Sequence, residues 1–141
     1  SRNVKIDGGF YLDGGLSDSI PLQRSIIDGN RKNVVVMTKE TGFVRKQARG
    51  YMLWLLRARY WRYPKVAELM ARRRDNYNDQ VAYVERLKEN GQAFVFRPKA
   101  GLHVGRVEKD AEKLKLLYRW GYEDAASQYE ALTEFLAGEE I

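Results

Sequence analysis

The chain has 141 residues, and its 25 Lys and Arg against 19 Asp and Glu give a formal net charge of +6. It contains no cysteine, which excludes a disulfide scaffold, a CxxC redox site and a cysteine-ligated zinc site. No apolar run approaches the roughly 18 residues that span a bilayer, and no signal pattern opens the chain. We therefore expect a cytoplasmic protein of about one domain. Any association with a membrane is expected to be peripheral.

The first elements predicted are two β-strands in a hairpin over residues 3–12. Short β-prone runs at 4–6 and 10–12 flank Asp7 and Gly8. An Asp-Gly pair between apolar runs is a strong hairpin signal, because both turn positions favour positive φ.

A short helix and a buried strand are predicted next. Residues 21–28 are expected to be helical, with Ser19 as the N-cap and Gly29 closing the helix. The β-branched run at 33–38 predicts a strand buried on both faces, as in parallel sheets. Strand, glycine loop, helix and strand in this order predict a β-α-β unit.

The rest of the chain is predicted to be mainly helical. Helices are expected at about 47–62 and 65–89, and a strand near 93–97. A final apolar stripe begins after Asp110, which can cap it, and Gly121 is a candidate break within it.

The predicted fold class is therefore α/β, with a partial, mixed or mostly parallel sheet flanked by helices and a helix-rich C-terminal half. We expect residues 1–40 to supply strands of an α/β domain that carry the Asp-Gly-Gly loop. Residues 41–141 are expected to form the helix-rich region with its one further strand.

Asp13, Gly14 and Gly15 form the first candidate site. The carboxylate follows a β-run, and two residues without side chains would let another group approach it closely. A carboxylate at a sheet rim can act as a general base. The alternative is an ordinary turn, as expected for the same tripeptide at Asp7.

Residues 11–21, from Tyr11-Leu12-Asp13-Gly14-Gly15 to Pro21, resemble the Asp-Gly-Gly block of patatin-like phospholipases. Further blocks are similar to the bacterial branch of that family: 28–36, 62–64, 77–78, 94–98 and 121–125. The resemblance implies a lipid-degrading acyl hydrolase with a Ser–Asp dyad and no cofactor, in which Asp13 takes the proton of the serine. Gly14 and Gly15 would shape the loop.

The chain departs from that family in one important respect. It contains no Gly-Xaa-Ser-Xaa-Gly, since Ser17 lies in Gly-Leu-Ser-Asp-Ser, and no glycine-rich oxyanion loop precedes Asp13. The resemblance therefore implies a C-terminal portion that is inactive alone. We also expect an upstream segment to complete the sheet, since the apolar run at 33–38 needs neighbouring strands.

Other catalytic and metal-binding candidates are weak. His103 is the only histidine, and it is a poor candidate for a catalytic triad. Asp7, Asp13 and Asp18 do not have the spacing of a calcium loop, so no metal is expected.

The segment 51–63 is the candidate interaction surface. It combines Trp and Tyr with several arginines, a composition suited to anionic membrane interfaces. This supports an alternative function as a noncatalytic module that binds an anionic membrane or a protein partner. Packing of these rings within a helical core, and stacking on single-stranded nucleic acid, are the other readings; nucleic acid is not expected.

Overall fold

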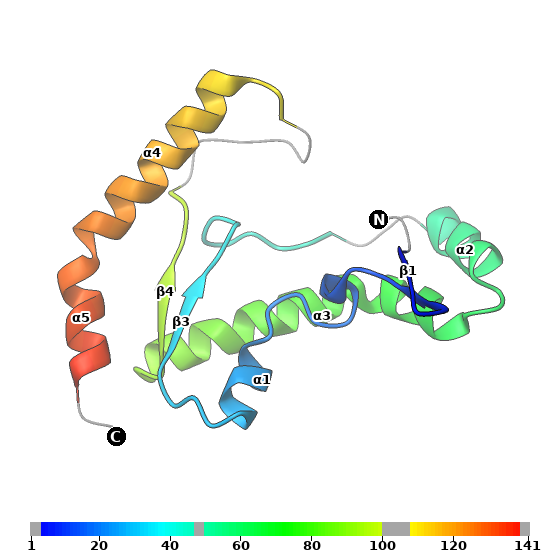
Figure 1. The fold of residues 1–141 in the computed structure, drawn as a ribbon, viewed down its shortest axis with the longest axis horizontal. Coiled ribbons are helices and arrows are strands. Elements are labelled where there is room, and N and C mark those ends of the chain that lie inside the picture. Colours follow the sequence, from blue (N-terminus) through cyan, green and yellow to red (C-terminus); the bar gives the residue numbers. More distant parts are fainter. Residues whose placement is uncertain (1–3, 47–49, 100–107, 139–141) are drawn as a thin grey trace. The chain divides into compact units, whose positions relative to one another are not determined.

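The computed structural model describes residues 4–46, 50–99 and 108–138 (Figure 1). The chain divides into two compact units, one formed by residues 1–21 with 44–83 and the other by residues 22–43 with 84–141. The chain passes between the two units three times, at 21/22, 43/44 and 83/84. The two-part division expected at residue 40 stays a prediction.

The first unit begins with the predicted hairpin. Strands β1 (Val4–Ile6) and β2 (Gly9–Tyr11) pair antiparallel, with Val4 opposite Tyr11. Asp7 and Gly8 have φ values of 47° and 82°, the positive values that a two-residue turn of this kind requires. The hairpin prediction is confirmed for the described residues, which begin at Val4.

Two helices complete this unit. Helix α2 (Gly50–Arg59) and helix α3 (Pro64–Glu89) correspond to the helices predicted at 47–62 and 65–89. The first helix ends three residues before the predicted end, in a turn at 60–62, and residues 47–49 lie outside the described part of the chain. Pro64 is the first residue of α3, where its missing N–H leaves no helical hydrogen bond unmade. In this unit Ala67 and Tyr77 of α3 are buried.

The second unit is built from two helix-to-strand steps of the same kind. Helix α1 (Leu22–Ile27) leads through Gly29 into β3 (Asn33–Val36), and α3 leads through Gly91 into β4 (Ala93–Phe96). Gly29 and Gly91 have φ values of 94° and 71°, and the residue after each donates its N–H back into the final turn of the helix. Both helices thus end in a Schellman motif, which strongly favours glycine.

Strands β3 and β4 form a parallel pair, with Asn33 opposite Ala93 and Val35 opposite Val95. The parallel pairing of the apolar run is confirmed, but the predicted β-α-β unit with residues 10–12 is wrong, because β2 and β3 belong to two separate sheets. The Asp7–Gly8 turn provides β2 with a partner from its own hairpin, and β3 finds its partner 60 residues further along the chain.

The prediction that the strand at 33–38 is buried on both faces is also wrong. Val34 is 44% exposed and Val36 is 73% exposed, whereas Asn33 and Met37 are buried. One face of the pair covers a core that contains Leu22, Val84, Leu87, Ala93 and Val95. The upstream strand expected to complete this sheet stays a prediction.

The chain ends in two helices, α4 (Ala111–Ser127) and α5 (Tyr129–Ala137). Asp110 caps α4 as predicted, since its Oδ1 accepts the N–H groups of Glu112 at 3.0 Å and Lys113 at 3.3 Å. The break falls at Gln128, not at Gly121, which continues α4.

Helix α5 packs on the second strand pair through one aromatic contact. The rings of Phe135 and Phe94 lie 5.8 Å apart between centroids, and Phe94 in turn contacts Phe96 at 5.1 Å. The ammonium of Lys32 lies 5.8 Å from the Phe135 ring and donates to the carbonyl groups of Leu136 and Gly138. These contacts fix the last turn of α5, and the architecture as a whole is helix-rich α/β, as predicted.

Candidate functional site

Asp13 caps a short helix. Its Oδ1 accepts the N–H of Gly15 at 2.9 Å, and this closes the first turn of the 3₁₀ helix η1 (Gly14–Leu16). The Asp13 side chain is exposed. The strand that precedes it, β2, belongs to the two-stranded hairpin. The structure therefore places Asp13 at a turn after a hairpin strand, and this strand is not part of the parallel pair.

The neighbouring groups of the Asp13 loop are also engaged locally. Gly14 and Gly15 lie in η1 without positive φ, so their backbone angles are open to other residues. The hydroxyl of Ser17 donates to the Gly14 carbonyl at 3.0 Å, and that of Ser19 donates to the Gly15 carbonyl at 2.9 Å. Ser19 thus stabilises the η1 turn and does not cap α1. The role of Asp13 as a base stays a prediction.

Two amide side chains on α3 hold the first unit together. Gln80 Oε1 accepts the N–H groups of Ser19 and Ile20 at 3.2 and 3.1 Å, and its Nε2 donates to Asp18 at 2.7 Å. Sequence reasoning did not identify Gln80, because a polar residue on a helix face carries no signal of a partner about 60 positions away.

Asn78 makes the corresponding contact with the other segment of this unit. Its side-chain amide accepts the N–H of Arg45 at 2.9 Å and donates to the Arg45 carbonyl at 3.2 Å. The amide thus makes the same pair of hydrogen bonds to the backbone that a neighbouring β-strand would make. The Arg45 guanidinium also lies 4.2 Å from the centre of the buried Tyr77 ring. The chain leading into α2 is therefore anchored on α3.

Helix α2 presents a large apolar surface to solvent. Tyr51, Trp54 and Leu55 are 59%, 69% and 48% exposed, and they follow the i, i+3, i+4 spacing of one helical face. Trp61 in the following turn is 75% exposed. No residue of α2 is buried, so the reading of these rings as core packing is wrong.

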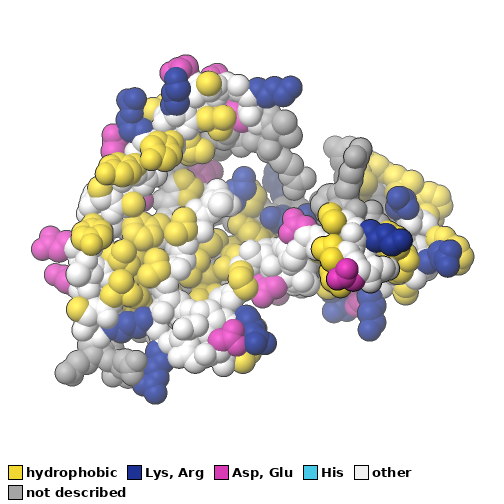
Figure 2. Space-filling model, viewed as in Figure 1, with side chains coloured by type: hydrophobic (Ala, Val, Ile, Leu, Met, Phe, Trp, Pro, Cys, Tyr) yellow, Lys and Arg dark blue, Asp and Glu magenta, His cyan; other side chains and the backbone are white. Residues whose placement is uncertain are grey.

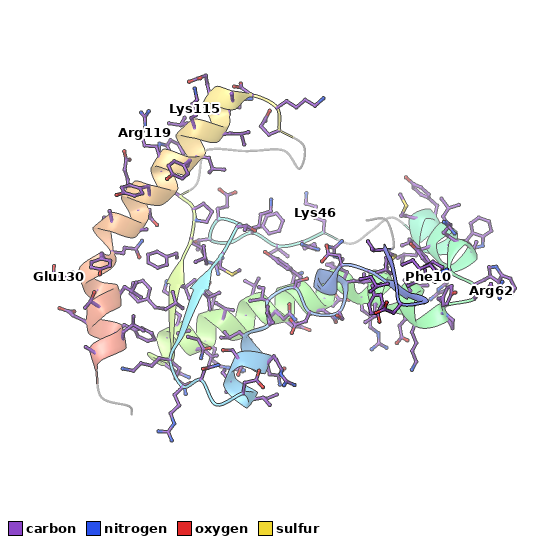
Figure 3. The ribbon with its side chains drawn as sticks, in the orientation of Figure 1. Phe10, Lys46, Arg62, Lys115, Arg119 and Glu130 are labelled. Atoms are coloured by element: carbon purple, nitrogen blue, oxygen red, sulfur yellow. The ribbon has the colours of Figure 1, made fainter. Side chains whose placement is uncertain are left out.

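Basic side chains surround this apolar face. Arg57 and Arg59 lie in the last turn of α2, and Arg62 lies in the turn before α3. Residues 41–67 contain no Asp or Glu, and the basic residues of this stretch are Arg45, Lys46, Arg49, Arg57, Arg59, Arg62 and Lys65. Figure 2 shows yellow apolar and dark-blue basic side chains intermixed around α2, and Figure 3 shows Arg62 at the outer edge of the ribbon beside it.

We call this set the basic–aromatic surface and define it by Tyr51, Trp54, Leu55, Arg57, Arg59, Trp61 and Arg62. Two of its arginines lie beside aromatic rings: the guanidinium of Arg59 is 5.7 Å from the ring of the neighbouring Tyr60, and that of Arg62 is 5.9 Å from the Trp61 ring. No ion pair joins these three arginines to an acidic group within the described residues. Their charge is therefore available to an anionic partner.

A pocket of about 480 Å³ opens where α2 turns into α3. It is lined by Arg57, Tyr60, Trp61, Pro64, Ala67, Glu68, Ala71 and Arg72. Its charged groups are of both signs, because Glu68 and Arg72 form an ion pair at 3.1 Å, one helical turn apart. The sequence signals for it are the closely spaced Tyr60-Trp61 and the basic residues around them.

A second pocket, of about 540 Å³, lies in the other unit at the ends of α1, α3 and α5. Lys32 is part of its lining, and its ammonium is already bonded to the last carbonyl groups of α5. This pocket is best explained as the place where Lys32 closes the helix end.

Metal binding and membrane spanning find no support in the described residues. Outside residues 1–3, 47–49, 100–107 and 139–141, no group of His, Asp and Glu side chains is placed to hold a metal ion. His103 lies outside the described residues. None of the described helices is both long enough and apolar enough to cross a bilayer.

Comparison with known protein families identifies a domain in the second half of the chain. Residues 63–137, from the turn before α3 to the end of α5, match a family model described as a domain of unknown function (DUF6363). No patatin family matches, so the assignment of the chain to patatin-like phospholipases is wrong. Short shared blocks such as Asp-Gly-Gly are too common in turns to establish a family. No curated protein and no solved structure matches the chain.

Proposed function

Because the chain belongs to the DUF6363 family, for which no activity is described, we propose a function from its surface: a peripheral module that binds anionic membranes. The basic–aromatic surface is the binding face, and the cytoplasmic leaflet is the target, because that leaflet carries the anionic lipids. The observation that carries the proposal is Trp54 and Trp61 at 69% and 75% exposure among arginines that have no acidic partner in the described residues.

The apolar part of this surface supports insertion at the interface. A Trp ring offers about 200 Å² of surface, so Trp54 leaves about 140 Å² uncovered, worth roughly 3 kcal/mol if fully transferred out of water. Rings at a lipid interface remain partly wet, so we expect about half of that value. Trp and Tyr are the side chains that favour this depth of the bilayer.

The basic part supports selectivity for anionic lipid. A Lys or Arg near an anionic leaflet contributes about 1 kcal/mol, so Arg57, Arg59 and Arg62 together contribute about 3 kcal/mol. This corresponds to roughly a hundredfold in partitioning. Attraction of this kind is screened by salt over about 8–10 Å, so binding is expected to weaken as the ionic strength rises.

The test is co-sedimentation of the 141-residue chain with vesicles of phosphatidylcholine alone or mixed with phosphatidylglycerol, at low and high salt. We expect binding to the mixed vesicles to be salt-sensitive and much tighter than binding to phosphatidylcholine alone. Replacing Arg57, Arg59 and Arg62 with Gln should reduce it about a hundredfold. The matched control replaces Lys113, Lys115 and Arg119 of α4 with Gln, which also lowers the formal net charge from +6 to +3. Lys115 and Arg119 are labelled in Figure 3.

Several results would overturn the proposal. Equal losses in the two triple variants would mean that net charge alone drives binding. Absence of binding to either vesicle, together with recovery of a stable protein complex, would assign the basic–aromatic surface to a protein partner. Tighter binding to single-stranded nucleic acid than to vesicles would assign it to that polyanion.

A further inference from the structure

The pocket at the α2–α3 turn contains more chemistry than a general attraction to anions needs. Its volume of about 480 Å³ falls within the usual range of sites for small ligands. All of its lining residues belong to the first unit, on α2, on the turn at 60–63 or on the first three turns of α3. Hydrogen bonds from Tyr60 N–H to the Leu56 carbonyl (3.0 Å) and from Tyr63 N–H to the Tyr60 carbonyl (2.8 Å) fix that turn.

The cationic side of the pocket suits a phosphate group. Arg57 contributes a guanidinium that has no ion pair in the described residues, and Arg72 contributes a second. A guanidinium presents several N–H donors in a planar fork that fits two phosphate oxygens. The pocket therefore has the donors for a single phosphate oxyanion.

The anionic and aromatic side suits an organic cation. Glu68 lies in the same wall, 3.1 Å from Arg72, and both side chains are largely exposed, at 57% and 69%. An exposed pair of this kind contributes little stability, so a ligand can take over either partner. Tyr60 and Trp61 add ring faces, and such faces together with a carboxylate recognise ammonium groups.

We propose that this pocket binds the headgroup of a zwitterionic phospholipid, in which a phosphodiester is joined by a short link to an ammonium group. The phosphodiester bonds to Arg57 and Arg72, while the ammonium lies between Glu68 and the rings of Tyr60 and Trp61. A simple anion would leave Glu68 opposed to it, and a simple cation would face two arginines. The inference rests on the proposed membrane binding, because the headgroup reaches this pocket from a bilayer that the basic–aromatic surface contacts.

The test uses soluble probes and so does not depend on vesicles. A Trp54→Phe, Trp120→Phe background leaves Trp61 as the only tryptophan. Its fluorescence is titrated with glycerophosphocholine, glycerol phosphate and choline chloride, which present both charges, the phosphate alone and the ammonium alone. We expect saturable binding of glycerophosphocholine, at least tenfold tighter than that of either single-charge probe.

Variants then separate the two halves of the pocket. Glu68→Gln is expected to weaken glycerophosphocholine about tenfold and to leave glycerol phosphate unchanged or tighter, whereas Arg57→Gln weakens both. The matched control is Glu112→Gln, which breaks an exposed ion pair with Lys115 (2.9 Å) on α4 and should change neither titration.

Each outcome decides the question. Binding of glycerol phosphate as tight as that of glycerophosphocholine would show a plain anion site and overturn the proposal, as would choline binding of equal strength or no titration at all. If the probes fail while mixed vesicles still bind, only the pocket assignment falls. If glycerophosphocholine binds while vesicles do not, the membrane proposal falls and the pocket remains.

Discussion

The ion pair between Arg97 and Glu85 provides the sharpest test of how the second unit is held together. Arg97 follows β4, and its side chain is only 10% exposed; Glu85 on α3 is 37% exposed. Arg97 also donates to the carbonyl of Glu40 at 3.4 Å. This hydrogen bond is long and neutral at the acceptor, so it would compensate little for the loss of the Glu85 carboxylate. Replacing Glu85 with Ala leaves a largely buried guanidinium without a carboxylate.

The expected loss follows from those exposures. Removing one partner of a buried pair costs about 3–5 kcal/mol, and water entering beside the one-third-exposed Glu85 reduces this to about 2–3 kcal/mol. For a chain of this length, each kcal/mol lowers the Tm by roughly 3–4 °C, so we expect a fall of about 8 °C. Urea unfolding followed by circular dichroism gives the same quantity as a free energy.

A matched control and a double variant make this result decisive. Asp28→Ala breaks the exposed Arg24–Asp28 pair and should change stability by about 0.5 kcal/mol or less. Replacing both Glu85 and Arg97 with Met should recover most of the loss, because no charge then stays buried. A Glu85→Ala variant no less stable than Asp28→Ala would refute the argument that burial makes this pair important.

Three further predictions concern single elements. Phe135→Ala should remove the ring contact that seats α5 and lower stability by about 2 kcal/mol, with faster amide exchange confined to residues 129–137. Gly91→Ala should lower stability by about 1 kcal/mol in urea unfolding, since the φ of 71° strains any residue with a Cβ while open space surrounds the position. The N–H groups of Asp110 and Lys109 lower the pKa of Glu108 below its ordinary 4.5, so its stabilising contribution is present above that value and lost as the pH falls through the lowered pKa. Replacing Glu108 with Gln should therefore make the Tm fall less steeply at acidic pH. An unchanged dependence of Tm on pH would contradict this role of Glu108.

Local sequence signals predicted the elements well. The Asp7–Gly8 turn and the cap at Asp110 depend on neighbouring residues only, and both are found where they were predicted. The helix predicted from about residue 65 begins one residue earlier, at Pro64. Gly29 closes α1 for the same reason, because a helix end needs positive φ within a residue or two.

Long-range pairing was not predictable in the same way. The run at 33–36 carries no information about whether its neighbour is residues 10–12 or residues 93–96, since both are short and apolar. Periodicity also describes which side chains share a face without saying that anything covers it. For that reason the stripe on α4 was predicted correctly as a stripe, yet Tyr118 and Tyr122 are 76% and 69% exposed.

The candidate site shows the same limit. An aromatic and basic segment was recognised at 51–63, but its exposure, and the pairing of Glu68 with Arg72 in one pocket wall, required the structure. The Asp-Gly-Gly motif at Asp13, by contrast, pointed to a catalytic loop in the sequence, whereas in the structure Asp13 caps the short helix η1.

The uncovered side of β3 has a consequence for handling the isolated protein. The N–H groups of Asn33 and Met37 donate towards β4, so the backbone groups of Val34 and Val36 face the other edge of the strand, which pairs with no strand in the described part of the chain. A short run of β-branched residues with such an edge can template intermolecular sheets, and the charges that flank it, including Lys32 before it and Lys39 after it, oppose this association. Neutralising these two lysines, by acetylation for example, should turn a dispersed preparation into one that forms amyloid-like fibres.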